Sequence, residues 1–230
     1  MTFRNHFLQA MELDDRTALK PFMEEIVLRQ GERLTAAGDP TAVVAFPETA
    51  VFSSQVVIEG DQLLDGLSTG VETGLGLLDA IQQRPASLAQ VARVAGSAIV
   101  IPADVFRRRV AGGDGLRSLL LNHVRAQGIY AQHLLVCPSV HRAPSRIARI
   151  LLQTADRSDG AIALSQDSIA ANLALQRTTV TSCMANLKRS GVLDYARSKV
   201  NLTNRLELEK QACGCYRAFR ELYELNSGKR

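Results

Sequence analysis

The sequence predicts an α+β protein with a strand-rich N-terminal half, a long helix and a C-terminal helix-turn-helix followed by a β-hairpin. Three observations lead to this prediction. Short apolar segments alternate with turn residues over residues 26–101, a helical period of apolar residues runs over residues 116–136, and two short helices share an apolar core in residues 165–192. The 230 residues, 46% hydrophobic and 22% charged, suffice for two modest globular domains.

The strand-rich half begins with an amphipathic helix over residues 5–20 and then changes to segments with a period of two. Turn residues such as Gly31 and Pro40 separate these segments. Short strands at this spacing predict an antiparallel sandwich or barrel, after which a glycine-containing loop, residues 70–80, leads into a short apolar helix. The expected strands are residues 26–28, 32–34, 42–46, 51–58, 63–67 and 91–101.

A long helix is predicted between the two halves of the chain. Pro102 starts a shorter helix before it, and the three arginines Arg107–Arg109 are interpreted as a solvated face. The long helix, residues 116–136, would span about 30 Å, and Pro138 is expected to end it, so that residues 137–144 form a hinge. Apolar residues three and four apart suit a seam between two subunits of a symmetric homodimer, as well as contact with the protein's own β-domain. The predicted seam residues are Leu116, Leu120, Val124, Tyr130 and Leu134.

The most specific local pattern lies in residues 165–192. Ser165 is a good N-cap for a first helix, and Gly191 follows a second helix where a left-handed stop is expected. The apolar spacing gives the two helices one shared core, which is the helix-turn-helix pattern. A helix over residues 145–155 precedes them, and a single amphipathic helix over residues 205–225 is expected to close the chain. The shared core residues are Ile169, Leu173, Val180, Met184 and Leu187.

The second helix of this motif has a polar, cationic face opposite its apolar stripe. Such a helix can lie in the DNA major groove, where Arg pairs with guanine and Thr contacts a thymine methyl group. Residues 193–202 alternate apolar and polar and predict a β-hairpin wing, whose turn would meet phosphates. The alternative is an ordinary helical domain with a solvated face. The predicted DNA-binding residues are Gln176, Arg177, Thr178, Thr181, Ser182, Lys188, Arg197 and Lys199.

The charge of the chain is divided unevenly between its halves. Residues 1–137 carry 12 Lys and Arg against 15 Asp and Glu, whereas residues 138–230 carry 15 against 8. The basic half is the half with the helix-turn-helix. This arrangement favours a polyanionic partner and salt-sensitive binding, and together with the wing it favours double-stranded DNA over RNA or an anionic membrane.

The four cysteines are too few for a disulfide framework. Cys137 and His141 are four residues apart and could share a helical face, but Pro138 intervenes, and Cys213 and Cys215 would point to different faces of a helix. We therefore expect neither a metal ion nor a cofactor, and buried packing for Cys183 and Cys213. A dithiol switch or a metal clip is the alternative.

Two function classes find no support in the sequence. Residues 21–110 contain neither His nor Cys, so a metal-dependent enzyme or a haem site on the strand-rich half lacks ligands, and we expect no enzyme. The chain has no run of about eighteen apolar residues, and residues 1–15 lack the core of a signal peptide. A cytoplasmic protein without membrane contact is expected.

The order of these parts resembles the Crp/Fnr superfamily of bacterial transcription regulators. The resemblance implies a cyclic-nucleotide-binding-like β jelly-roll sensor domain over residues 1–112, a dimerisation helix over 113–137 and a winged helix-turn-helix domain over 138–230. It also implies a pseudo-palindromic DNA operator, a small-molecule effector and, for an activator, contact with RNA polymerase. The motifs that carry it are residues 28–38, 46–53, 70–76, 146–151 and 164–181, with Cys137-x-x-x-His141 and Cys213-x-Cys215 similar to one branch of the superfamily.

Two departures from the superfamily's pattern bear on function. Cyclic-AMP-binding members use a Glu and an Arg-Ser/Thr-Ala triplet; Glu72 matches the Glu, but residues 86–89 contain no Arg, and an unpaired buried phosphate is costly. We therefore expect no control by cyclic AMP, with Glu72, Arg84 and Ser87 as candidate effector-pocket residues. The recognition helix lacks the superfamily's second base-contacting Arg, so a different operator sequence is expected.

The effector is left open by the sequence. Residues 1–136 contain no cysteine, which argues against the N-terminal iron–sulfur cluster of oxygen-sensing members. A member that responds to a cyclic nucleotide, a member that responds to redox state through its cysteines, and a ligand-binding module that acts through a protein partner are the alternatives. Whether the protein activates or represses transcription is open as well.

Overall fold

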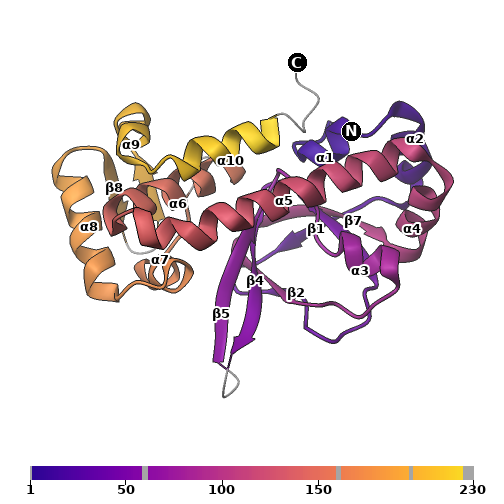
Figure 1. Ribbon diagram of the computed structural model, residues 1–230, viewed down its shortest axis with the longest axis horizontal. Helices are drawn as coiled ribbons and strands as arrows, with labels where there is room; N and C mark the ends of the chain where they lie inside the picture. Colours follow the sequence, from indigo (N-terminus) through magenta and orange to yellow (C-terminus); the bar gives the residue numbers. More distant parts are fainter. Residues whose placement is uncertain (1, 59–61, 159–161, 197–198, 225–230) are drawn as a thin grey trace.

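The N-terminal half forms two antiparallel sheets. A computed structural model describes residues 2–58, 62–158, 162–196 and 199–224 (Figure 1). One sheet has the strand order β1-β7-β3 and the other the order β2-β6-β4-β5, and every neighbouring pair is antiparallel. This arrangement confirms the predicted α+β class with an N-terminal antiparallel β-domain. The strands are β1 Glu24–Leu28, β2 Arg33–Thr35, β3 Val43–Pro47, β4 Val51–Ile58, β5 Gln62–Thr69, β6 Ala89–Val94 and β7 Gly96–Pro102.

The predicted strand over residues 91–101 is wrong, because it is two strands. The chain leaves β6 before Ala95 and enters β7 at Gly96, which lies against Thr49 and Ala50. A Cβ atom on Gly96 would lie 2.4 Å from the Ala50 nitrogen, so this position requires glycine. Small side chains between the sheets, including Ala92 and Ala98, let the two layers approach closely.

The predicted helix over residues 5–20 is also two elements, α1 His6–Ala10 and α2 Leu13–Leu19, followed by a 3-10 turn, Lys20–Phe22. The Asn5 side chain caps α1 by accepting from the Phe7 and Leu8 backbone N–H groups. Met11 adopts an extended conformation and is buried, so burial of its side chain in the core interrupts the helix.

The long helix is α5, Asp114–Val140, which follows α3, Leu77–Gln82, and α4, Ala103–Gly112. The prediction that Pro138 ends this helix is wrong. Pro138 falls in the last turn, where its missing N–H removes a single hydrogen bond, and the His141 N–H still donates to the Cys137 carbonyl at 2.9 Å. The connection to the next helix is therefore only residues 141–142, shorter than the predicted hinge.

Three of the predicted seam residues pack α5 within its own chain. Leu116 and Leu120 are buried in a core with Phe7 and Phe106 of the N-terminal half, and Tyr130 is buried against Phe219. This corrects their assignment to a subunit seam and agrees, for Leu116 and Leu120, with the expected contact to the β-domain. Val124 and Leu134 are partly buried, Val124 against the first of these clusters and Leu134 against the second.

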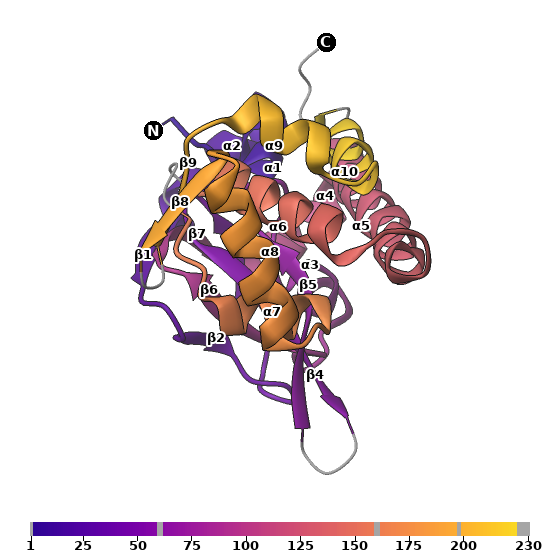
Figure 2. The same ribbon diagram turned by 90° about the vertical axis from the view of Figure 1, so that its left-hand side faces the viewer.

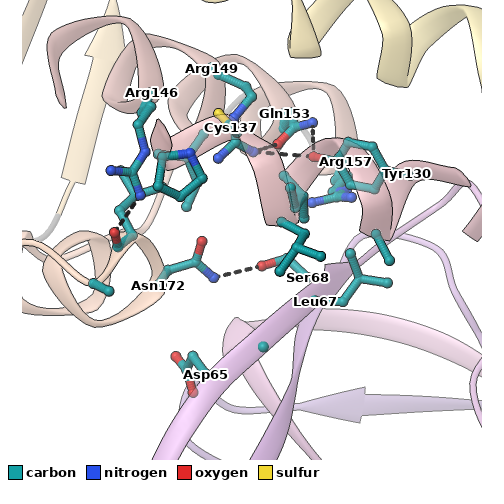
Figure 3. Close-up of a pocket in the computed structure, with 18 residues that line it drawn as sticks. Asp65, Leu67, Ser68, Tyr130, Cys137, Arg146, Arg149, Gln153, Arg157 and Asn172 are labelled. Carbon is teal, nitrogen blue, oxygen red and sulfur yellow. Dashed lines mark hydrogen bonds between the residues drawn. The ribbon is translucent and has the colours of Figure 1, made fainter. Parts of the chain in front are cut away.

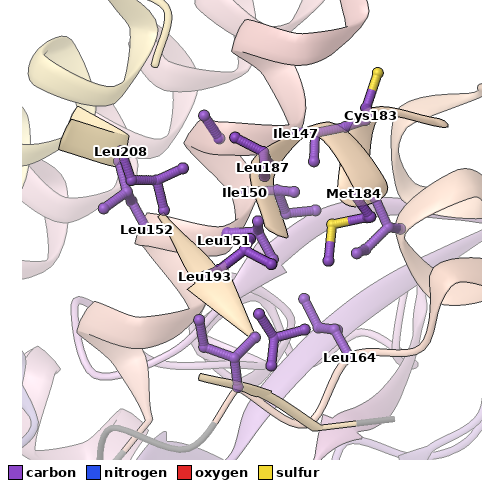
Figure 4. Packing of buried hydrophobic residues seen from close by; sticks show 14 of the residues in the cluster. Ile147, Ile150, Leu151, Leu152, Leu164, Cys183, Met184, Leu187, Leu193 and Leu208 are labelled. Carbon is purple, nitrogen blue, oxygen red and sulfur yellow. The ribbon is translucent and has the colours of Figure 1, made fainter. Parts of the chain in front are cut away.

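The C-terminal half contains the predicted helix-turn-helix and wing. Its elements pack around one large apolar cluster formed by α6, α7, α8 and the wing, with Ile147, Leu151, Met184 and Leu193 near its centre (Figure 4). The elements are α6 Ala143–Arg157, α7 Gln166–Leu173, α8 Arg177–Arg189, β8 Leu193–Ala196, β9 Lys199–Leu202, α9 Arg205–Gln211 and α10 Cys215–Glu224.

The expected single C-terminal helix is wrong, because α9 and α10 are separate. Ala212 adopts an extended conformation at the end of α9, and Gly214, a weak helix former, lies in the break. The break turns α10 so that it lies along α5 (Figure 1), with the ring centroids of Tyr130 and Phe219 5.1 Å apart. None of the helices in the described part of the chain is long and apolar enough to cross a membrane.

A buried histidine lies where α5 crosses the N-terminal core. His123 is 1% exposed, and its ring lies 4.7 Å from the ring of Phe7, with Nδ1 3.0 Å from the Leu119 carbonyl oxygen. Burial lowers the pKa of His123, and repulsion from His6 adds to this effect. Hydrogen bonds to the backbone of Leu119 and Glu72 and the charge of Glu72 act in the opposite direction but do not outweigh burial. The imidazole is therefore neutral in the folded protein at neutral pH.

We predict that His123 makes the folded protein sensitive to acid. Its pKa is lower in the folded than in the unfolded chain, so below about pH 6.5 the unfolded chain binds more protons and the free energy of unfolding falls by up to about 1.4 kcal/mol per pH unit. His123→Asn should flatten this dependence in urea unfolding measured over a pH series. The same substitution at the half-buried His133 of α5 is the control, and identical slopes for wild type and His123→Asn would contradict the prediction.

Candidate nucleic-acid interface and sensor elements

Side chains satisfy backbone groups at both ends of α7. Ser165 caps α7 by accepting from the Ser168 N–H at 3.0 Å, as predicted. Ala174 ends α7 with φ of 49°, a left-handed conformation that is strained for a residue with a side chain. The guanidinium of buried Arg146 on α6 donates to the Leu173 carbonyl at 2.6 Å and so satisfies the end of α7. The sequence did not reveal this role of Arg146.

Helix α8 separates an apolar from a polar face, as its sequence pattern predicts. Val180, Met184 and Leu187 are buried, and Gly191 has the expected left-handed φ of 71° just after the helix. Helix α8 and the wing lie on the same end of the molecule (Figure 2). The predicted DNA-binding residues of α8 and of its N-cap are all exposed: Gln176, Arg177, Thr178, Thr181, Ser182 and Lys188.

Acidic and amide groups from α7 organise the first turns of α8. Arg177 Nη1 lies 3.2 Å from Asp167 Oδ1, and both side chains are exposed. Thr181 Oγ1 donates to Gln166 Oε1 at 2.6 Å. Exposed pairs of this kind contribute less than about 1 kcal/mol, so a nucleic acid can displace them. The helical period of α8 cannot reveal Asp167 and Gln166 as partners, because both residues belong to the neighbouring helix α7.

The last turn of α8 is tied to the wing. Lys188 Nζ lies 2.6 Å from Asp194 Oδ1 and 5.3 Å from the centre of the Tyr195 ring. This contact raises the pKa of Lys188 and lowers that of Asp194, so both groups are charged at neutral pH. Lys188 therefore orients the wing relative to α8, in addition to any contact with a ligand.

The wing is the predicted hairpin. Strands β8 and β9 pair in register from Leu193 with Leu202 to Ala196 with Lys199, and Ile162 adds a bridge to Val200. Lys199 is exposed at the start of β9. Arg197 lies outside the described residues.

The candidate effector residue Glu72 is used in a buried ion pair between the two halves of the chain. Arg157 of α6 donates from Nη2 to Glu72 Oε1 at 2.6 Å and from Nε to Oε2 at 3.1 Å, and both side chains are at most 3% exposed. The Arg157 guanidinium also lies 4.8 Å from the centre of the Phe219 ring. Gly70 makes room for this pair, because a Cβ atom there would lie 2.5 Å from Arg157 Cγ.

Arg84 and Ser87 lie apart from Glu72. Both are exposed; Ser87 Oγ donates to Asp79 Oδ1 at 2.7 Å, and Arg84 lines a different cavity from Glu72. The structure thus does not bring the three predicted effector residues together. A cavity lined by Leu75 and Leu88 of the β-domain has a volume of only about 20 Å³, far below the several hundred Å³ of typical ligand sites.

A larger cavity of about 370 Å³ lies between the two halves (Figure 3). Strand β5 and helices α5, α6 and α7 line it. Arg149 is buried there and donates to Gln153 Oε1 at 2.8 Å and to the Tyr130 hydroxyl at 3.2 Å, while Asn172 of α7 donates to Ser68 of β5 at 3.0 Å. The volume lies in the range of small-molecule sites, and the polar lining combines Asp65 with arginines that already donate to protein acceptors.

A second polar cluster lies where α5 ends. The expectation that Cys213 and Cys215 lie on different faces of one helix is wrong, because Cys213 lies in the break between α9 and α10 and Cys215 begins α10. Both thiols therefore lie beside Cys137 and His141, and the ligand atoms of the four residues are all within 4.8 Å of one another. Cys183 is buried in the C-terminal core, as expected.

Comparisons with known proteins agree with this architecture. Residues 145–211 match the family of Crp-like helix-turn-helix domains, whereas no curated protein matches the sequence. FixK2 from Bradyrhizobium japonicum is similar with a TM-score of 0.68 and 20% identity, over 83% of this chain and 98% of that one. TTHB099, a CRP-family transcriptional regulator from Thermus thermophilus, is similar with a TM-score of 0.61 and 21% identity, over 81% and 96%.

A third solved structure is TTHA1359, a CRP/FNR-family transcriptional regulator that also comes from Thermus thermophilus. It is similar with a TM-score of 0.64 and 16% identity, over 82% of this chain and 98% of that one. The chain therefore has the fold of Crp/Fnr regulators, and residues 145–211 match the family of Crp-like helix-turn-helix domains. The resemblance found in the sequence is confirmed at this level.

We predict that the Glu72–Arg157 pair holds the two halves together. Glu72→Gln or Arg157→Met alone leaves one charge buried without its partner, and each should lower the free energy of unfolding by about 3–5 kcal/mol. The double variant Glu72→Gln/Arg157→Met removes both charges and should recover a large part of this loss. Urea unfolding of the four proteins measures the coupling; additive losses would show that the pair contributes nothing of its own.

Proposed function

We propose that this chain, which has the fold of Crp/Fnr-type DNA-binding transcription regulators, binds a pseudo-palindromic DNA operator as a homodimer and is not controlled by cyclic AMP. The observation that carries this proposal is the amphipathic character of α8: its polar face is exposed, and its apolar face is buried in a domain that matches Crp-like helix-turn-helix domains. We infer a regulator rather than an enzyme.

The polar face of α8 suits the major groove. Arg177, at the first position of the helix, can pair with the two acceptors of a guanine, and Thr178 and Thr181 can contact neighbouring bases or a thymine methyl group. Lys199 on the wing can contact a phosphate. The first residues of α8 would thus select the sequence, and the wing would position the domain.

The proposal that cyclic AMP is not the effector rests on charge. Glu72 already accepts both bonds that Arg157 offers, and residues 86–89 supply no Arg for a cyclic phosphate. A phosphate buried in the β-domain would therefore lack a cationic partner.

The homodimer is inferred from an exposed strip of α5. Leu121, Gly128 and Leu135 follow one another at seven-residue intervals, and Val124 and Ala131 lie between them at the other apolar positions of a heptad. Space around a Cβ atom at Gly128 is open, so a partner helix can approach there. Leu135 is 73% exposed, which a subunit interface would explain.

Selection of binding sites from randomised duplex DNA tests the proposed function. The full-length, ligand-free protein should enrich a two-fold symmetric motif whose half-sites lie about one helical turn apart, roughly 34 Å. If no motif emerges from folded, dimeric protein, the selection should be repeated with cyclic nucleotides, reductant and metabolites. A motif that requires a cyclic nucleotide would overturn the cyclic-AMP part of the proposal, and no motif under any condition would overturn the DNA part.

We predict that Arg177→Ala costs about 1–3 kcal/mol in binding the selected operator and relaxes specificity at one guanine per half-site. Arg217→Ala removes an exposed arginine from α10, away from α8, and serves as the control. Binding isotherms on operator and random DNA measure both effects. Equal losses on the two DNAs would assign Arg177 to phosphate contact instead.

Lys199→Ala should behave differently from Arg177→Ala. Loss of a phosphate contact should weaken binding to operator and random DNA alike and reduce the slope of log affinity against log salt by about one. If Lys199→Ala lowered the affinity for the operator but not for random DNA, the proposal that the wing contacts phosphates and α8 contacts bases would be contradicted.

We predict that Leu135→Asp weakens the dimer by at least about tenfold, because a charge replaces an apolar side chain at the proposed seam. Leu206→Asp on α9 is a matched control, since Leu206 is 72% exposed and Leu135 is 73% exposed. Sedimentation over a concentration series measures the dissociation. Equal dissociation constants for the two variants would place the interface elsewhere.

A further inference from the structure

We propose that Cys137, His141, Cys213 and Cys215 bind one zinc ion. The four residues come from three places in the chain: the last turn of α5, the connection after it, and the break between α9 and α10. The inference goes beyond the proposed function, since nothing in a helix-turn-helix regulator requires a metal at this position.

Helix geometry explains half of the site. Cys137 and His141 are four residues apart, and α5 continues through Pro138 to Val140, so both side chains lie on the same side of its end. The helical hydrogen bond from the His141 N–H to the Cys137 carbonyl fixes their spacing. A helix that ended at Pro138 would not hold these two ligands together.

The break between α9 and α10 supplies the other half. Residues two apart on a helix point to different faces, but the extended Ala212 and the following turn bring both Cys213 and Cys215 toward α5. The Cys213 N–H donates to the Ser145 carbonyl of α6 at 3.2 Å, and the Tyr216 N–H to the Cys213 carbonyl at 2.9 Å. These bonds hold the backbone of the Cys-x-Cys segment in place.

The distances match a single tetrahedral ion. Cys137 Sγ and Cys213 Sγ are 3.9 Å apart, and Cys215 Sγ lies 3.8 Å from His141 Nδ1. With Zn–S bonds of about 2.3 Å, two sulfurs of a tetrahedral site are about 3.8 Å apart. An iron–sulfur cluster needs its ligands farther apart, because the cluster itself occupies the space between them.

The chemistry of the donors also suits zinc. Three thiolates and one neutral imidazole form a common structural zinc set, and binding would release the three thiol protons to solvent. The loaded site would carry a net charge of −1, and the buried cation of Arg149 interacts electrostatically with both Cys137 and Cys213. The three cysteines are at most 5% exposed, while half-buried His141 leaves a route for the ion.

The ion would join the end of α5 to the start of α10. Both helices meet the C-terminal domain here, so the ion would fix the orientation of that domain relative to the long helix. We therefore expect the ion to be structural, with all four positions filled by protein ligands.

Metal analysis of the full-length protein, purified under reducing conditions, tests the site. Wild type and Cys183→Ser, which removes a buried cysteine outside the cluster, should contain about one zinc per chain, and Cys213→Ser should lose most of it. Cobalt added to stripped wild type should give the absorption of a tetrahedral thiolate site, weaker in His141→Ala. If Cys213→Ser does not fold, wild type can be tested directly. A chelator should then release zinc and, at the same time, make three thiols reactive.

Three results would overturn the proposal: folded wild type that binds neither zinc nor cobalt under reducing conditions, the absorption of an iron–sulfur cluster, or a Cys137–Cys213 disulfide in place of bound metal. None of these measurements involves DNA, so failure of the metal site is distinguishable from failure of the proposed function.

Discussion

The ion pair between Glu72 and Arg157 is the contact on which the arrangement of the two halves depends. It joins the loop after β5 to the last turn of α6, and both side chains are removed from water. Arg157 reaches Glu72 only because Gly70 has no side chain, and Phe219 of α10 covers the guanidinium. A buried pair of this kind adds little stability over an apolar contact but is costly to break, because separating the two halves or removing one partner would leave a charge without its counter-charge.

This contact also changes what the loop containing Glu72 can do. Glu72 accepts two bonds from Arg157 and a third from the Gly70 N–H at 3.2 Å, so few of its lone pairs are left for the hydroxyl groups of a ribose. Any effector that used Glu72 would have to compete with Arg157 and would thereby loosen the C-terminal domain. The cavity beneath α6, with buried Arg149, offers space for a ligand without this competition.

The sequence predicted those features whose causes are local. The stripe of Val180, Met184 and Leu187 follows directly from helical period, and Ser165 caps its helix by a contact within one turn. The failures have non-local causes. Pro138 weakens a helix by removing one bond, yet the surrounding contacts keep α5 intact, and the partners of Arg177 and Lys188 come from other elements that no period can identify. The need for glycine at positions 70 and 96 could not be predicted, because the atoms that approach these positions belong to residues distant in the sequence.

Helix α5 contributes to three separate buried clusters, each of which contains a different segment of the helix. Its first turns, with Leu116 and Leu120, complete the core of the β-domain; Tyr130 packs on α10; and Cys137 lies in the thiol cluster at its end. The buried side of the helix is therefore occupied along its length, whereas the strip with Leu121, Gly128 and Leu135 is exposed. A second subunit bound to that strip would contact α5, which packs on α6, and α6 in turn packs on α8; the dimer contact would thus influence the spacing of the two recognition helices through α6.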